Sequence, residues 1–131
     1  MKRVCLLVLV FIQLLCLFCF AEADQLSPSA TGRINIRCNL SMNGNNIVGY
    51  VNASVQAGMT MSLTATLQYK TEAGVWRAKS TATGSGGIPV TVTCAASSGT
   101  SYRIKYTYNL YNNLHELEES GSGYSSVFQT P

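Results

Sequence analysis

Apolar and polar residues alternate along most of the chain from Thr31 onward. In the first such stretch every second residue from Ile34 to Met42 is apolar or cysteine, and the residues between are polar. A period of two is typical of a β-strand with one buried face. Residues 43–46, Asn-Gly-Asn-Asn, predict a hairpin turn after this strand, because Asn and Gly tolerate positive φ angles.

The same alternation predicts further strands, separated by turn residues. They cover about residues 47–56, 60–71, 75–78, 88–96, 102–110 and 124–129. We expect a turn at residues 72–74 and a loop at the Gly- and Ser-rich residues 83–87. Seven short strands, with no competing helical spacing after residue 30, favour an all-β fold in the form of a β-sandwich.

The first residues of the chain have a different pattern. Lys2 and Arg3 precede an apolar run from Val4 to Phe20, and Ala21-Glu22-Ala23 follows it. A basic start, an apolar run and small residues at the exit predict a secretory signal peptide, residues 1–23, cleaved after Ala23. The alternative is an uncleaved membrane anchor, but the run is short for a bilayer and acidic residues follow it.

We therefore expect a secreted, extracellular protein that meets the membrane only transiently, through its signal peptide. Residues 24–30 are expected to be a disordered lead-in, and residues 31–131 the β-sandwich domain. Beyond residue 23 there are seven basic and five acidic residues, so the charge is near +2. The basic residues occur singly, which argues against nucleic acid as a partner.

Two cysteines follow the signal peptide, Cys38 and Cys94. In an exported protein such a pair predicts a disulfide. By closing the loop between the two cysteines, this bond would stabilise the folded state by ~2–4 kcal/mol. Two isolated cysteines and the single histidine, His115, do not form a zinc-ligand pattern, so no metal or other cofactor is expected.

Few residues suggest catalysis. His115 has no nucleophile motif beside it, and no catalytic residue is predicted. The acidic segment Glu116–Glu119 is expected in a loop before the last strand, where solvated charge is the usual outcome. Calcium binding by these carboxylates remains an alternative that the sequence leaves open.

Aromatic residues provide the ligand-binding candidates. Tyr102, Tyr106 and Tyr108 share the predicted inward face of their strand and are expected in the core. The expected surface aromatics are Trp76, Tyr50, Tyr111 and Tyr124. Aromatic faces of this kind stack on sugar rings, although packing is the commoner role of a tryptophan near a sheet edge.

Three segments carry a family resemblance: Leu67-Gln68-Tyr69-Lys70, Gly74-Val75-Trp76, and the run from Gly99 to Tyr106. Together they resemble fibronectin type III and immunoglobulin-like domains. The resemblance implies that Tyr102 is a tyrosine corner, whose hydroxyl bonds to backbone near the preceding turn. The chain also resembles small secreted proteins of unknown function from Gram-positive bacteria, which implies export and this fold.

The topology implied by the resemblance conflicts with the disulfide. It places the strands of Cys38 and Cys94 on either side of the second strand, ~9.6 Å apart, whereas a disulfide needs Cα atoms within ~7 Å. Pairing would require the first strand to leave the sheet or a bulge to intervene. Otherwise the thiols stay apart, but the extracellular setting still favours pairing.

The sequence predicts a non-enzymatic domain that acts outside the cell by protein–protein contact. Exposed edge strands with Ser- and Thr-rich faces carry few charges to prevent a partner strand from adding to the sheet. The alternative function is a carbohydrate-binding module that uses Trp76 and the surface tyrosines. The expected partner is therefore an extracellular protein or a glycan.

Overall fold

A computed structural model describes residues 27–28 and 32–131, and the predicted signal peptide lies outside these residues. The described chain forms β-strands and no helix, so it contains no helix that could span a bilayer. The strands are β1 (Ser27–Pro28), β2 (Ile34–Asn43), β3 (Asn46–Val55), β4 (Thr60–Lys70), β5 (Trp76–Ser85), β6 (Val90–Ala95), β7 (Ser101–Tyr111), β8 (Leu117–Tyr124) and β9 (Phe128–Gln129).

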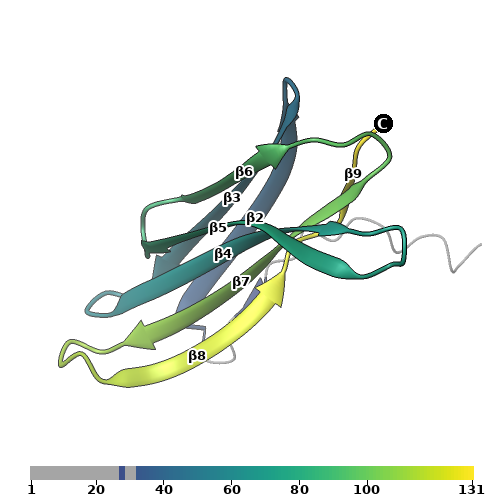
Figure 1. Ribbon diagram of the computed structural model, residues 1–131. Helices are drawn as coiled ribbons and strands as arrows, with labels where there is room; N and C mark the ends of the chain where they lie inside the picture. The colour runs from purple at the N-terminus through teal and green to yellow at the C-terminus, as the bar shows by residue number, and fades with distance from the viewer. Residues whose placement is uncertain (1–26, 29–31) are drawn as a thin grey trace, which may run out of the picture.

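The strands form two antiparallel sheets that pack face to face (Figure 1), which confirms the all-β fold and the sandwich architecture. One sheet, here called sheet A, has the order β1-β2-β3-β6. The other, sheet B, has the order β5-β4-β7-β8, and β9 also pairs with β7. The connections β3–β4, β5–β6 and β7–β8 lie at one end of the sandwich, and β2–β3, β4–β5 and β6–β7 lie at the other.

The predicted hairpin at residues 43–46 is present. Asn43 pairs with Asn46, and Gly44 has the positive φ, 59°, that the turn requires. From this turn β2 and β3 pair without interruption to Ile34 and Val55. Alternate residues are buried along the paired strands, as the period of two predicted.

Two local predictions were wrong. The loop predicted at residues 83–87 starts later than expected, because β5 pairs with β4 as far as Ser85. The acidic segment is not a loop before the last strand: Leu117–Tyr124 is the strand β8 on the edge of β7. Of the expected lead-in, residues 24–30, the structure describes only Ser27 and Pro28, which form β1 and pair with β2. Glycine, serine and acidic residues have low strand propensity, so only pairing with a neighbouring strand reveals these elements.

The core lies between the sheets. It contains the inward side chains of both, and its largest fully buried members are Ile47, Leu63, Leu67, Ile104, Leu110, Val51 and Val92. Burying each such side chain contributes ~1.5–3 kcal/mol. Gly49 sits in the middle of β3, where an added Cβ would lie 2.8 Å from Ile104 Cδ1 of the opposite sheet. A side chain there would push the sheets apart.

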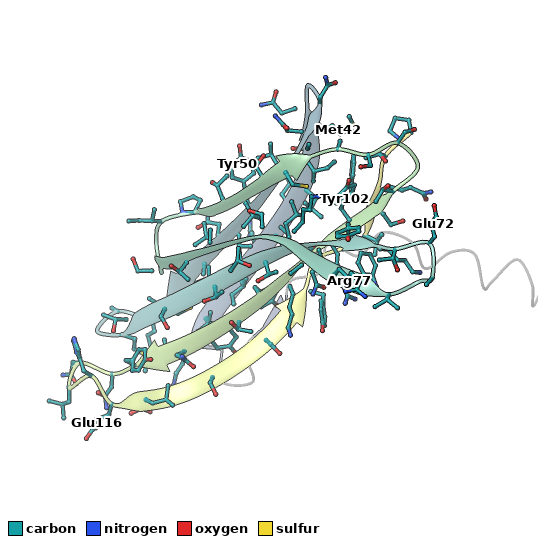
Figure 2. All side chains as sticks on the ribbon, in the orientation of Figure 1. Met42, Tyr50, Glu72, Arg77, Tyr102 and Glu116 are labelled. Atoms are coloured by element: carbon teal, nitrogen blue, oxygen red, sulfur yellow. The ribbon has the colours of Figure 1, made fainter. Side chains whose placement is uncertain are left out.

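Tyr102 closes the end of the core at the β6–β7 connection (Figure 2). Its hydroxyl accepts a hydrogen bond of 2.9 Å from the backbone N–H of Ser97, which is the contact expected of the tyrosine corner. The buried Thr130 hydroxyl donates to the Ser97 carbonyl at 2.6 Å and accepts from the Thr100 N–H at 2.9 Å. The connection is therefore held from both sides.

Candidate functional site

Two of the four aromatic candidates lie on the outer face of sheet B, on either side of one arginine. The Arg103 guanidinium carbon is 4.3 Å from the centroid of the Trp76 ring and 4.1 Å from that of Tyr124. Lys70 Nζ lies 5.9 Å from the Trp76 centroid. These cation–π contacts run across the sheet from its edge strand β5 to its edge strand β8.

The other two candidates are elsewhere. Tyr50, labelled in Figure 2, is exposed on sheet A, whereas Trp76 belongs to sheet B. Tyr111 ends β7 at the far end of sheet B, where it pairs with Thr60 and Leu117. The structure thus does not bring the four together into one stacking platform, and Arg103 already occupies a face of both Trp76 and Tyr124.

The same region gathers basic side chains that are isolated in the sequence. Lys70 on β4 and Arg103 and Lys105 on β7 share the outer face of sheet B. Arg77 and Lys79 lie on the adjoining part of β5 but toward its other face, where Arg77 pairs with Tyr69 and Lys79 Nζ lies 5.6 Å from the Tyr69 ring centroid. None of the five forms a salt bridge with another residue of the described chain. This cluster could not be predicted from the sequence, because the β4–β7 pairing joins residues more than thirty positions apart.

The predicted disulfide between Cys38 and Cys94 is wrong for this structure, in which both cysteines are free. Cys38 pairs with Val51 of β3, and Cys94 pairs with Ile47 on the other side of the same strand. They are thus two strand spacings apart, ~9.6 Å, and offset by four residues, ~13 Å, along the strand. Neither a bulge nor a departure of β2 from the sheet brings the cysteines together. Their Cα atoms are therefore too far apart for a disulfide.

Burial decides the ionisation of both thiols. It raises the pKa of Cys38 to about 11, and it also raises that of Cys94, where the positive charge of Lys79 acts in the opposite direction. Reactive cysteines need a lowered pKa, so these thiols are poor nucleophiles.

The acidic segment is organised by one asparagine. The Asn112 side-chain amide donates to Glu116 at 2.9 Å and to Glu118 at 3.0 Å, and its oxygen accepts the backbone N–H groups of Leu114 and Glu116. Glu118 also pairs with Arg33 at 3.2 Å. No group of three or more histidine, cysteine or acidic side chains in the described chain is arranged to hold a metal.

His115 stands at the tip of this β7–β8 hairpin, exposed to solvent. Its φ of 63° is left-handed, and its backbone N–H donates to the Asn112 carbonyl at 3.0 Å. The backbone of His115 is thus part of the hydrogen-bonded turn between β7 and β8. The same tip exposes two apolar side chains, with 73% of Leu114 and 59% of Leu117 accessible.

A third surface feature is a shallow hollow of about 190 Å³ on the outer face of sheet A, lined by Asn35, Arg37, Asn52 and Ser54. These residues are cross-strand partners on β2 and β3, Asn35 with Ser54 and Arg37 with Asn52. Their side chains are amides, a hydroxyl and one guanidinium, which provides hydrogen-bonding groups and no nucleophile activated by a base.

The edge of sheet B at β5 is open. Among the described strands β5 pairs with β4 alone. A bulge opposite Leu67 and Gln68 interrupts its first half, which carries Arg77 and Lys79. The second half, from Ser80 to Ser85, is regular and uncharged. Bulges and lysines are the usual protection of an edge strand, so only the second half is unprotected.

The chain matches no family model, and neither the curated proteins nor the solved structures contain a match to it.

Proposed function

We propose that this protein is a secreted, non-enzymatic binding domain of the fibronectin type III or immunoglobulin-like type, and that it acts through protein–protein contact. The amino-terminal pattern supports export. The strand order β2-β3-β6 against β5-β4-β7-β8, together with the Tyr102 contact, supports the domain type.

The observation that carries this function is the open edge of β5 from Ser80 to Ser85. An unpaired edge offers a row of backbone N–H and C=O groups to an extended segment of a partner, which adds to the sheet as a further strand. No charge in this half of β5 opposes such a partner.

The direction of the backbone groups follows from the ladder. Gly86 N–H donates to the Met61 carbonyl at 3.2 Å, which continues the β4–β5 ladder beyond Ser85. Because hydrogen-bonded and non-hydrogen-bonded pairs alternate in antiparallel sheets, the N–H groups of Thr81 and Thr83 point away from β4. The hydroxyls of Thr66 and Thr81 approach to 3.1 Å, as side chains do in the closer, non-hydrogen-bonded pairs.

Two substitutions at one position test strand addition. Thr83→Pro removes an N–H that β4 does not use, whereas Thr83→Ala changes the side chain and leaves the backbone intact. Partners captured from the medium into which the protein is secreted should bind Thr83→Pro roughly tenfold more weakly than wild type, from lost backbone bonds and the bulk of the ring. They should bind Thr83→Ala as wild type, and thermal melting should show both variants folded.

The reverse pattern, loss of binding in Thr83→Ala but not in Thr83→Pro, would mean that a partner reads side chains and not the backbone edge. Equal binding by all three proteins would remove the β5 edge as the contact surface. Hydrogen exchange gives an independent reading, since strand addition protects the amides of Thr81 and Thr83 in the complex.

A further inference from the structure

Arg103 is held in place by three neighbours on the outer face of sheet B. Its Nε donates to Gln68 Oε1 at 2.9 Å, and the rings of Trp76 and Tyr124 lie 4.3 and 4.1 Å from its guanidinium carbon. No described residue accepts a hydrogen bond from its two terminal nitrogens. The side chain is therefore an ordered guanidinium whose outer edge still has donors to offer.

Two lysines extend the positive charge on this face. Lys70 lies over the Trp76 ring, which Arg103 also contacts. Lys105 follows Arg103 by two positions on β7 and is therefore ~6.8 Å farther along the same face. Lys105 is the cross-strand partner of Tyr124. We name Lys70, Arg103 and Lys105, with the rings of Trp76 and Tyr124, the basic face.

Three of the four acidic residues that the structure describes lie at the other end of the molecule. Glu116, Glu118 and Glu119 belong to the β7–β8 hairpin, far from Arg77 and the β4–β5 end (Figure 2). Glu72 occupies the β4–β5 turn and forms no salt bridge with the basic face. The positive charge of the basic face is thus not neutralised by the described part of the chain.

We propose that the basic face binds an acidic polysaccharide through its carboxylate or sulfate groups. A guanidinium edge matches two oxygens of such a group at once, and the flanking lysines add point charges. Because the rings already fix Arg103, little side-chain entropy is lost when a ligand binds. Beside the basic face the sheet presents a cross-strand row of hydroxyls, Thr64, Thr107 and Ser122, that suits the hydroxyls of a sugar chain.

Other polyanions fit this surface less well. Single-stranded nucleic acid needs open aromatic faces on which its bases stack, and Arg103 covers a face of both Trp76 and Tyr124. A membrane surface favours several apolar side chains that enter the lipid beside the basic ones. Val75 is exposed next to Trp76, but Leu114, the most exposed large apolar side chain of the described residues, lies with Leu117 at the opposite end of sheet B.

Titration calorimetry of the secreted protein tests the ligand class. The probes are a heparin oligosaccharide for sulfate, oligogalacturonate for carboxylate, dextran as the neutral glycan, an oligothymidylate, and phosphatidylglycerol vesicles. We expect one or both acidic glycans to bind, with an affinity that falls as salt is added, and dextran not to bind. A preference for heparin would identify sulfate as the group that the basic face recognises, and a preference for oligogalacturonate would identify carboxylate.

Matched variants test the site. Lys105→Gln should weaken acidic-glycan binding about fivefold, and Arg103→Lys, which keeps the charge but loses the guanidinium edge, about tenfold. Arg37→Gln and Arg37→Lys make the same changes on the outer face of sheet A and should leave the affinity unchanged. Lys105 takes no part in the cation–π contacts of Arg103 with Trp76 and Tyr124, so its variant tests the proposal even if Arg103→Lys proves unstable.

Equal weakening by Arg37→Gln and Lys105→Gln would reduce the effect to net charge and overturn the site. Binding of dextran as tight as that of the acidic glycans would point to ring stacking instead of charge. Oligothymidylate or vesicles that bind more tightly than either glycan would overturn the ligand class. The proposal relies on the protein being extracellular but not on the β5 edge, so Thr83→Pro, which tests the edge, should bind acidic glycan normally.

Discussion

The Tyr108 side chain connects the core strand β7 to the edge strand β8 of sheet B. It leaves β7 on the inward face, lies across Gly121 of β8, and donates its hydroxyl proton to Glu119 Oε1 at 2.8 Å. Burial, followed by the hydrogen bond and the charge of Glu119, raises the Tyr108 pKa to about 12. Each of these causes favours the neutral phenol over the phenolate.

This pKa predicts a stability that depends on pH. The raised pKa means that Tyr108 keeps its proton in the folded protein while an unfolded chain, with a tyrosine pKa near 10, loses it. Its contribution is therefore complete below pH 10 and falls as the pH rises toward 12. Urea midpoints at pH 9 and pH 11 should differ less in Tyr108→Phe than in wild type. Tyr50→Phe, at an exposed position, should show the wild-type difference.

At the scale of the element, β8 depends on its glycines. Tyr108 and Tyr106 of β7 cover the backbone of β8 at Gly121 and Gly123, where a side chain would otherwise stand. The tyrosine rings supply the apolar contact that glycine lacks, as aromatic residues do beside glycines in other sheets. A strand with the sequence Leu-Glu-Glu-Ser-Gly-Ser-Gly-Tyr is thus stabilised mainly by its neighbour.

Gly121→Ala should destabilise the protein. The new Cβ would lie 2.7 Å from the Tyr108 hydroxyl oxygen and 2.8 Å from its ring carbon Cζ. The Glu119 bond holds this ring in place, so we expect overpacking to cost ~1–3 kcal/mol, more than the ~0.4–1 kcal/mol gained by restricting the unfolded chain. Ser122→Ala, whose side chain is on the opposite face of β8, should change the urea midpoint little. A midpoint in Gly121→Ala at or above that of wild type would contradict this packing.

At the scale of the whole molecule, the sandwich needs no covalent link between its strands. Cys38 and Cys94 are separated by β3, and no rotation of their side chains bridges two strand spacings and a four-residue offset. The fold is therefore expected to resist reducing agent, in contrast to small secreted domains that depend on disulfides.

The intact mass of the purified protein tests the proposed export and the thiol state together. We expect a mass that corresponds to residues 24–131, unchanged by reductant, and two alkylations after unfolding. Under native conditions Cys38 should react more slowly than Cys94, because the Cys38 pKa is near 11 and Lys79 partly offsets burial at Cys94. A mass two hydrogens lower that reduction restores would contradict the free thiols, and a full-length mass would contradict cleavage.

The sequence by itself determined the regular parts of this protein. Where burial on one face imposes a period of two, as from Ile34 to Met42 and from Tyr102 to Leu110, the residues alone predict a strand and its inward side. The Asn-Gly turn was also predictable, because it depends on a local requirement of the backbone. The bond between the Tyr102 hydroxyl and the Ser97 backbone was expected only from the resemblance to fibronectin type III and immunoglobulin-like domains.

Tertiary structure decided what depends on pairing between distant residues. β8 forms because β7 offers it an edge and two tyrosine rings, and β5 extends to Ser85 because β4 pairs with it. Cys38 and Cys94 stay apart because strand register fixes their offset. The basic face exists because the β4–β7 pairing puts Arg103 and Lys105 on the strand next to that of Lys70, residues that local sequence shows only as single charges.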